Sequence, residues 1–241
     1  MTGTTTQTVR KIALENPASI RVFEQFGIDY CCGGRKPLAE ACEAKQIRVE
    51  EVVAALERSA SEPAPAGVDF AGMTLASLTA HIIHAHHAYV RRELPRLTGL
   101  AQKVVNRHGD TRPELPEIQA KLAQLSEELT EHLAKEEVVL FPHIAKLERA
   151  LEQGTPMPYV CFGTVANPIA MMTQEHDAAG ELLAGMRALS NNFTPPAGAC
   201  PTFHGFYRGL LEFEQDLHQH IHLENNILFP RALAQETESQ R

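Results

Sequence analysis

The chain has 241 residues, which is more than one average domain, and 44% of them are hydrophobic, enough for a substantial core. Its formal net charge of −8 argues against a nucleic-acid partner. The first residues lack the apolar core of a signal peptide, and no later run approaches the length of a membrane span, so we expect no membrane partner.

Residues 1–59 are predicted to form a small helical domain. Its helices are expected in short amphipathic segments near residues 8–14, 17–26, 37–45 and 49–58. A stretch rich in Ser, Pro and Ala follows, which predicts a linker over residues 60–72. The rest of the chain, residues 73–241, then forms a second domain.

The small domain contains the run DYCCGG at residues 29–34. The two glycines allow the backbone to turn with positive φ directly after Cys31 and Cys32, which predicts that both thiols lie at the domain surface. Exposed neighbouring thiols bind soft metals or exchange disulfides, so this pair is a candidate thiol relay. Simple packing is the alternative for small cysteine side chains. It is the interpretation adopted for the other three cysteines, Cys42, Cys161 and Cys200.

The cysteine content indicates a reducing compartment. Five cysteines is an odd number, and Cys31 with Cys32 is a poor disulfide pair because adjacent Cα atoms lie only about 3.8 Å apart. We therefore expect reduced thiols and a cytoplasmic protein.

The second domain contains one stretch twice, at an offset of 88 residues, and both copies end in Leu-Phe-Pro. The first copy carries His132 and Glu136 where the second carries His220 and Glu224. In a helix, residues four apart lie on one face, about 6 Å apart along the axis, so one metal site can use both members of a pair. A repeat of this length indicates a repeated structural unit rather than an isolated motif.

Both His/Glu pairs are predicted to point into the core of the domain, because steps of three and four residues from each histidine meet apolar side chains. The predicted inward residues are Leu122, Leu125, Leu129 and Val139 around the first pair, and Phe206, Leu210, Phe213, Leu217 and Ile227 around the second. An unpaired carboxylate buried there would be strongly destabilising, and a metal ion removes that cost.

Each pair has a predicted partner histidine on an upstream helix. His176 lies 44 residues before the second pair and His87 lies 45 residues before the first, each in an apolar stripe, with His86 as the runner-up to His87. The stripes are Ile169, Met172, Ala179, Leu183 and Met186 in one helix, and Ala76, Ala80, Ile83, Val90, Leu94 and Leu97 in the other. The other histidines receive no ligand role: His81 and His84 on a polar face, His108 in a polar loop, His143, and the solvated His218 and His222.

These features predict an all-α protein whose second domain is an antiparallel four-helix bundle with ligands projecting into its core. If each glutamate bridges two ions and an oxo or hydroxo group adds a further bridge, about two coordination positions stay open. Imidazole and carboxylate ligands without thiolate favour iron or manganese over a structural zinc site. The candidate ligands are His87, His132, Glu136, His176, His220 and Glu224.

Two further carboxylates are candidates for supporting the ligands. Glu128 and Asp216 each precede a ligand histidine by four residues, at matching positions of the repeat. Each is placed to accept the outer imidazole N–H that a metal-bound histidine donates. A solvated carboxylate on the flank of a helix is the equally simple alternative.

Taken with DYCCGG, several motifs of the second domain resemble those of the bacterial iron-sulfur cluster repair family, also called the repair of iron centres family. These motifs are EEL..H..KEE..LFP around His132, EHD.AGELL at 175–183, NN.TPP..AC at 191–200 and H..LENN.LFPRAL at 220–233. The resemblance implies a hemerythrin-like bundle with a non-haem di-iron centre on the six candidate ligands. It also implies a stress-response role, in which iron-sulfur proteins damaged by nitric oxide or peroxide are the partners.

Three functions follow from these features. The protein is expected to donate iron to damaged clusters, as a repair protein rather than a conventional enzyme. The first alternative is a sensor or scavenger that binds nitric oxide or oxygen species at the open iron positions, and the second is a di-iron oxidoreductase. The resemblance favours repair, and the sequence is compatible with either a monomer or a homodimer.

Overall fold

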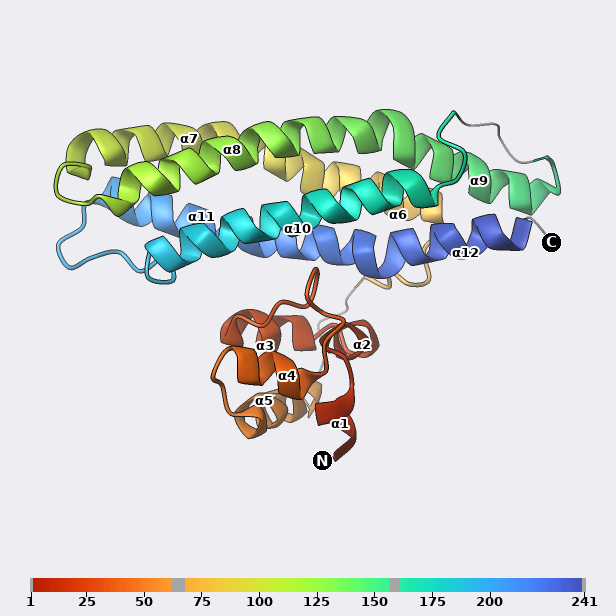
Figure 1. Cartoon of the computed structure of the whole chain (residues 1–241), viewed down its shortest axis with the longest axis horizontal. Coiled ribbons are helices and arrows are strands. Elements are labelled where there is room, and N and C mark those ends of the chain that lie inside the picture. Colours follow the sequence, from red (N-terminus) through yellow and green to blue (C-terminus); the bar gives the residue numbers. More distant parts are fainter. Residues whose placement is uncertain (1, 62–67, 157–160, 240–241) are drawn as a thin grey trace. The chain divides into compact units, whose positions relative to one another are not determined.

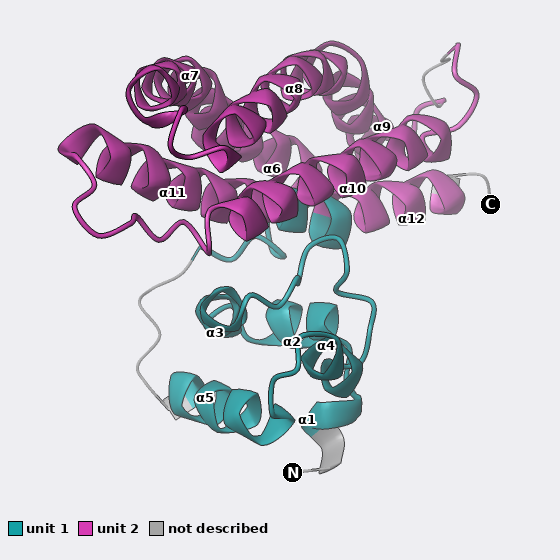
Figure 2. Ribbon diagram, turned by 60° about the vertical axis from the view of Figure 1, so that its left-hand side comes forward, with its two compact units in different colours: residues 1–73, 221–227 teal, residues 74–220, 228–241 magenta. Residues whose placement is uncertain are grey.

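The computed structural model describes residues 2–61, 68–156 and 161–239, and every regular element within these ranges is a helix (Figure 1). The predicted all-helical fold is therefore confirmed. The chain divides into two compact units, one of residues 1–73 with 221–227 and one of residues 74–220 with 228–241 (Figure 2). The expected linker includes residues 62–67, which lie outside the described residues.

The first unit is built from short helices. They are α1 (Thr2–Thr6), α2 (Val9–Glu15), α3 (Ser19–Phe26), α4 (Leu38–Ala44) and α5 (Val49–Ser61). The last four agree with the predicted segments, and α1 was not predicted. Thr8 starts α2 because its hydroxyl oxygen accepts a hydrogen bond from the Lys11 N–H at 3.2 Å. The core of the unit contains Val9, Phe23, Leu38 and Val52, all with 0% exposure.

The other helices form long rods, which make up the second unit except for residues 221–227. Apart from α10, each rod consists of segments that follow one another without a break (Figure 1). Helix α8 packs against both α7 and α10, and α6 packs against α9, so the first two rods run antiparallel. The rods are α6 (Leu75–Ile82), η1 (Ile83–His87) and α7 (Ala88–His108); α8 (Glu114–Lys135), η2 (Glu136–Leu140) and α9 (Phe141–Gln153); α10 (Ala166–Leu189); and α11 (Pro201–Leu223), η3 (Glu224–Leu228) and α12 (Phe229–Ser239).

The segments η1, η2 and η3 are single π-helical turns, in which hydrogen bonds run to the fifth residue rather than the fourth. Such a turn inserts one extra residue, so the buried face moves by one position along the sequence. Beyond η1 the predicted stripe is confirmed, since Val90, Leu94 and Leu97 are buried. Ahead of η1 it is wrong, because Ala76 and Ala80 are exposed. Their places in the core are taken by Leu75, Leu78 and Ile82.

The same shift occurs at η2, where Val139 was predicted to face inward but is 45% exposed and Leu140 is buried instead. Helix α10 contains no π turn, and its predicted stripe is confirmed at every position: Ile169, Met172, His176, Ala179, Leu183 and Met186. The stripe of α11 is confirmed as well, at Phe206, Leu210, Phe213 and Leu217. α-Helical spacing counted from a candidate ligand therefore predicts the buried face correctly where no π turn lies in between, as in α8, α10 and α11.

The repeat extends beyond the ligands to two carboxylates that lie 88 residues apart. Glu148 in α9 accepts hydrogen bonds from the backbone N–H groups of Leu75 at 2.6 Å and Ala76 at 2.9 Å, at the start of α6. Glu236 in α12 accepts one from the Val165 N–H at 2.8 Å, at the start of α10. In each copy of the repeat, the last helix of the later rod thus supplies the acceptor and the negative charge that the start of the earlier rod needs. Helix α9 does this for α6, and α12 does it for α10.

Replacing Glu148 with alanine is expected to lower the free energy of unfolding by about 1–2 kcal/mol, because two N–H groups at the start of α6 lose their acceptor and the helix start loses a favourable charge. Urea unfolding of the full chain measures the loss. The matched control is Glu152→Ala, which removes the same charge from an exposed position of α9 and should change stability by less than about 0.5 kcal/mol. Equal effects of the two variants would contradict the capping role.

Candidate metal centre

The structure brings the six candidate ligands together as two overlapping groups. One consists of His87, Glu136, His220 and Glu224, and the other of His132, Glu136, His176 and Glu224. Within each group, one nitrogen or oxygen atom per residue lies within 4.8 Å of all the others. The groups share both glutamates and differ in their histidines. All six side chains are buried, with at most 2% exposure.

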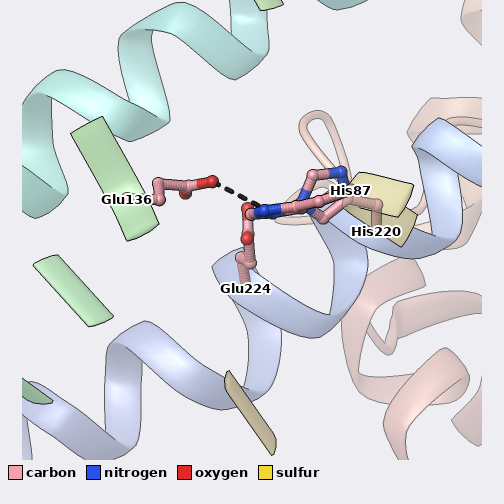
Figure 3. A group of neighbouring side chains, drawn as sticks. All are labelled: His87, Glu136, His220 and Glu224. Carbon is pink, nitrogen blue, oxygen red and sulfur yellow. Dashed lines mark hydrogen bonds and ion pairs between the residues drawn. The ribbon is translucent and has the colours of Figure 1, made fainter. Parts of the chain in front are cut away.

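The four rods contribute one histidine each, and the π turns accompany the ligands. Glu136 is the first residue of η2, Glu224 is the first residue of η3, and His87 is the last residue of η1. Turns of this kind occur mainly at functional sites. Figure 3 shows the first group: His220 and Glu224 come from one helical rod, and the Glu136 carboxylate points across from another rod toward His87.

Glu136 lies between the two groups. Its Oε2 atom is 3.4 Å from Nε2 of His87 and also 3.4 Å from Nε2 of His132. The imidazoles face each other in pairs: Nε2 of His87 lies 3.2 Å from Nε2 of His220, and Nε2 of His176 lies 3.1 Å from Nε2 of His132. The inner nitrogen atoms of all four rings therefore converge on the two shared carboxylates.

The donor set fits a pair of metal ions. Two carboxylates at 0% exposure repel each other in an apolar core and need cations near them. Neutral imidazole and carboxylate are the ligands that iron and similar first-row ions accept. A shared oxygen ligand between two histidine pairs suits two adjacent ions better than one.

Carboxylates outside the two groups hold the outer nitrogen atoms of two histidines. Nδ1 of His87 lies 2.7 Å from Glu137, which also pairs with Arg91 at 2.8 Å. Partial burial acts to raise the pKa of Glu137, but the bonds from Arg91 and His87 outweigh it and leave that pKa below its usual value. An ionised Glu137 accepts the outer N–H of His87 and so fixes which nitrogen faces the core.

Glu175 does the same for His132. Its carboxylate lies 2.8 Å from Nδ1 of His132 and 2.5 Å from Nζ of Lys135. Burial again acts to raise the pKa of Glu175, and the bonds from Lys135 and His132 lower it more. Sequence reasoning missed Glu137 and Glu175 as partners. The only signal was that each adjoins a ligand in the sequence, and this does not reveal a contact made across two helices.

The two predicted acceptors lie elsewhere. Glu128 is exposed and accepts a hydrogen bond from Gln124 at 2.9 Å, so its predicted place beside His132 belongs to Glu175. Asp216 meets Nδ1 of His86 at 3.1 Å. His86, the runner-up ligand, is buried and stacks on His220 with ring centroids 5.6 Å apart, but it belongs to neither group.

Two histidines contradict the predictions made for them. His222 was expected to be solvated, but it is 3% exposed and its Nδ1 lies 2.8 Å from the side-chain amide of Asn226, within the first unit. Burial lowers the pKa of His222 to about 4. His108 was expected in a loop, but it is the last residue of α7, and its Nε2 lies 3.4 Å from the Cys200 sulfur.

The glycines of the DYCCGG run serve a purpose that was not predicted. Asp29 accepts hydrogen bonds from the N–H groups of Cys31 and Cys32, both at 2.9 Å, and from that of Gly33 at 2.8 Å. Neither glycine has positive φ, so the predicted reason for them is wrong. A Cβ atom at Gly34 would lie 2.5 Å from the backbone oxygen of residue 30, and one at Gly33 would lie 3.0 Å from the Asp29 carboxylate. Close packing against the backbone excludes a side chain at Gly34, and a side chain at Gly33 would require the Asp29 carboxylate to shift.

The thiols are less exposed than predicted. Cys31 is 5% exposed and Cys32 is half-buried, with their sulfur atoms 3.7 Å apart. The hydrogen bond with Cys32 and burial raise the pKa of the Cys31 thiol well above its usual value. Both thiols and the Asp29 carboxylate form a third group within 4.8 Å of one another. Of the cysteines assigned to packing, Cys42 is buried, Cys200 is half-buried and Cys161 is exposed, so that interpretation is wrong for Cys161.

Comparison with known proteins agrees with this geometry. Residues 78–232 match the hemerythrin HHE cation binding domain, and residues 5–60 match a domain of unknown function, DUF542. The chain is 41% identical over 232 residues to the iron-sulfur cluster repair protein YtfE of Escherichia coli O157:H7, covering 95% of this chain and 98% of that protein. The same values hold for the proteins of that name from Shigella boydii serotype 4 and Citrobacter koseri.

Within the described ranges, no helix is long and apolar enough to cross a membrane. The hemerythrin match covers the rods that carry all six candidate ligands, and the DUF542 match covers the thiol pair. The relatives align over nearly their whole length. The chain therefore belongs to the family of hemerythrin-like iron-sulfur cluster repair proteins.

Proposed function

We propose that this protein repairs damaged iron-sulfur clusters by supplying iron from a dinuclear iron centre in its bundle. The relatives are named for cluster repair, and the hemerythrin match supports the di-iron character of the bundle. The observation that carries the proposal is the position of Glu136, 3.4 Å from the inner nitrogens of His87 and His132. A carboxylate shared in this way would be a ligand to both ions, and each ion would also be held by its own pair of histidines.

The proposed ligands are His87, His132, Glu136, His176, His220 and Glu224. With both glutamates bridging and an oxo or hydroxo group completing the bridge, about two coordination positions remain open. Iron bound there is both the resident centre and the cargo for repair. The protein side chains hold the ions in a water-excluded core, and the outer carboxylates keep the imidazole nitrogens aimed inward.

Release of iron from the bundle is supported by the partial exposure of the residues that hold His132 in place. The Glu175 side chain is 30% exposed and that of Lys135 is 41% exposed, and such partly exposed ion pairs contribute little stability. Both residues line a surface pocket of about 380 Å³ together with Glu128 and Glu131. Three carboxylates around one pocket beside His132 provide oxygen ligands that a departing cation meets on its way out.

The thiol pair is proposed as the next carrier. Imidazole and carboxylate are hard ligands, whereas a client cluster is built on soft thiolates, so Cys31 and Cys32 are a chemically sensible intermediate. All five cysteines are free thiols, as the cytoplasmic setting that we propose requires. The second candidate function is binding of nitric oxide or oxygen species at the open positions, which uses the bundle and leaves the thiols without a role.

The purified full chain is expected to bind two iron ions, and Glu136→Ala should reduce the content below one ion because it removes a ligand from both positions. Colorimetric iron analysis after anaerobic loading measures this. Glu127→Ala removes a carboxylate from an exposed position of the same rod and should retain both ions. A single ion in the unmodified protein, or full loading of Glu136→Ala, would contradict the shared-carboxylate site.

Loss of the outer acceptor is expected to weaken the centre without removing a ligand. Glu175→Gln should speed iron loss to a chelator by about 10-fold or more, since the His132 ring is no longer held by a charged acceptor. Glu128→Gln is the matched control, because Glu128 lines the same pocket but accepts its hydrogen bond from Gln124 rather than from a ligand histidine. If both variants lose iron at the same rate, the pocket charge rather than the bond to His132 controls retention.

The thiol relay is tested with the double variant Cys31→Ser with Cys32→Ser. Its iron content and its reaction with nitric oxide should stay intact, because no bundle ligand is touched, while recovery of a damaged client enzyme should fall. Cys161→Ser, at an exposed position, should repair normally. Full recovery with the double variant would restrict iron delivery to the bundle, and loss of nitric oxide binding would show that the two sites are linked.

A further inference from the structure

A second pair of reactive groups lies away from the metal centre. The sulfur of Cys200 is 3.4 Å from Nε2 of His108, and both side chains are half-buried. His108 ends α7 and Cys200 directly precedes α11. Each lies 20 or 21 residues from the ligand on its own rod, His87 or His220, which is about 30 Å along a helix. The pair is therefore chemically independent of the proposed iron site.

The start of α11 adds a second influence on the sulfur. The Cys200 carbonyl accepts the first hydrogen bond of this 23-residue helix, from the His204 N–H at 3.1 Å. Cys200 is therefore the residue that caps the helix start, where the unpaired N–H groups carry partial positive charge. Positive charge at this place stabilises the negative charge on the Cys200 sulfur once its proton has passed to an acceptor.

The loop before Cys200 is held in a strained conformation. Asn191, Asn192 and Phe193 all have positive φ, at 50°, 56° and 53°, in the region that residues with a Cβ atom rarely enter. Phe193 is 5% exposed, its N–H donates to the Ser190 hydroxyl at 2.9 Å, and the Arg187 guanidinium lies 5.0 Å from its ring centre. These contacts keep the loop in one arrangement, so Cys200 is presented to His108 from a defined position.

We propose that Cys200 and His108 form a thiol–imidazole pair that reacts with low-molecular-weight disulfides, which makes Cys200 a site of reversible modification. The Cys200 sulfur attacks one sulfur of the disulfide, and its proton passes to Nε2 of His108. The disulfide's own S–S bond breaks, a mixed disulfide forms on Cys200, and the departing thiolate takes the proton from His108. The disulfide is the only oxidant, and one thiol is released for each thiol modified.

Exposure alone predicts a different target. Cys161 is exposed whereas Cys200 is half-buried, and within the described parts of the chain Cys161 forms no hydrogen bond with an imidazole. If access to solvent decided reactivity, Cys161 would be modified first. If the imidazole and the helix start decide it, Cys200 is modified first. The two cysteines therefore form an internal comparison within one protein.

The test uses the full-length, iron-loaded protein with oxidised glutathione as the probe. Site-resolved mass spectrometry follows mixed-disulfide formation at each cysteine with time at neutral pH. Cys200 is expected to react faster than Cys161, and a reducing thiol should restore it. His108→Gln should slow the reaction of Cys200 by about 10-fold or more through loss of the proton acceptor, and should leave Cys161 unchanged. His204→Gln, which removes an exposed histidine of α11, should leave both rates unchanged.

Three results would overturn the proposal. The first is a Cys161 rate equal to or above that of Cys200 in the unmodified protein, a measurement that needs no variant. The second is an unchanged ratio of the two rates in His108→Gln, provided that its melting temperature matches that of the unmodified chain. The third is equal slowing by His204→Gln. None of these outcomes depends on cluster repair, so failure here leaves the proposed function untouched.

Discussion

The structure depends on the burial of two carboxylates in an apolar core. Glu136 and Glu224 have 0% exposure, and Oε2 of Glu136 lies 3.4 Å from the inner nitrogens of His87 and His132, which are neutral unless protonated. Two negative charges so placed would oppose folding by several kcal/mol or force protonation. Metal cations remove that cost, so binding of metal and stability of the bundle are linked quantities. The convergence of four histidines on these two oxygen donors follows from the same requirement.

The π turns help to position the candidate ligands through the backbone. Each of the three described turns begins or ends at a candidate ligand. By inserting one residue, a π turn rotates the apolar face of the rod on one side of the ligand relative to the other side. The ligand side chain still points inward, but the buried positions before and after the π turn no longer follow a single α-helical spacing. Ile82 and Val90, on either side of η1, are both buried in this way.

This explains which parts could be predicted from sequence. The His/Glu pairs and the stripe of α10 depend only on spacing within one α-helix, and spacing is visible in a sequence. The exposed Val139 was missed because nothing in the sequence pattern announces a π turn. Glu137 and Glu175 were missed because they reach ligands on other helices. The purpose of Gly34 was misjudged because a 2.5 Å approach of a backbone oxygen is a matter of tertiary packing.

The proposed transfer of iron depends on the difference between the fully buried ligands and the partly exposed carboxylates around them. The bundle ligands are fully buried, whereas the carboxylates that orient two of them reach the surface and are held there by Arg91 and Lys135. In the proposed transfer, opening these outer bonds would loosen a ligand without exposing the core, which makes it a low-cost first step.

The proposed transfer to Cys31 and Cys32 requires that a thiol first lose its proton. The raised pKa of Cys31 keeps that thiol protonated at neutral pH, and a metal ion must displace the proton in order to bind. In the proposed relay, the thiols would hold iron only when iron is delivered to them, and they would hold it less well as the pH falls. Under this proposal, iron stays in the bundle at rest and moves to soft ligands only when a client with still stronger thiolate ligands draws it onward.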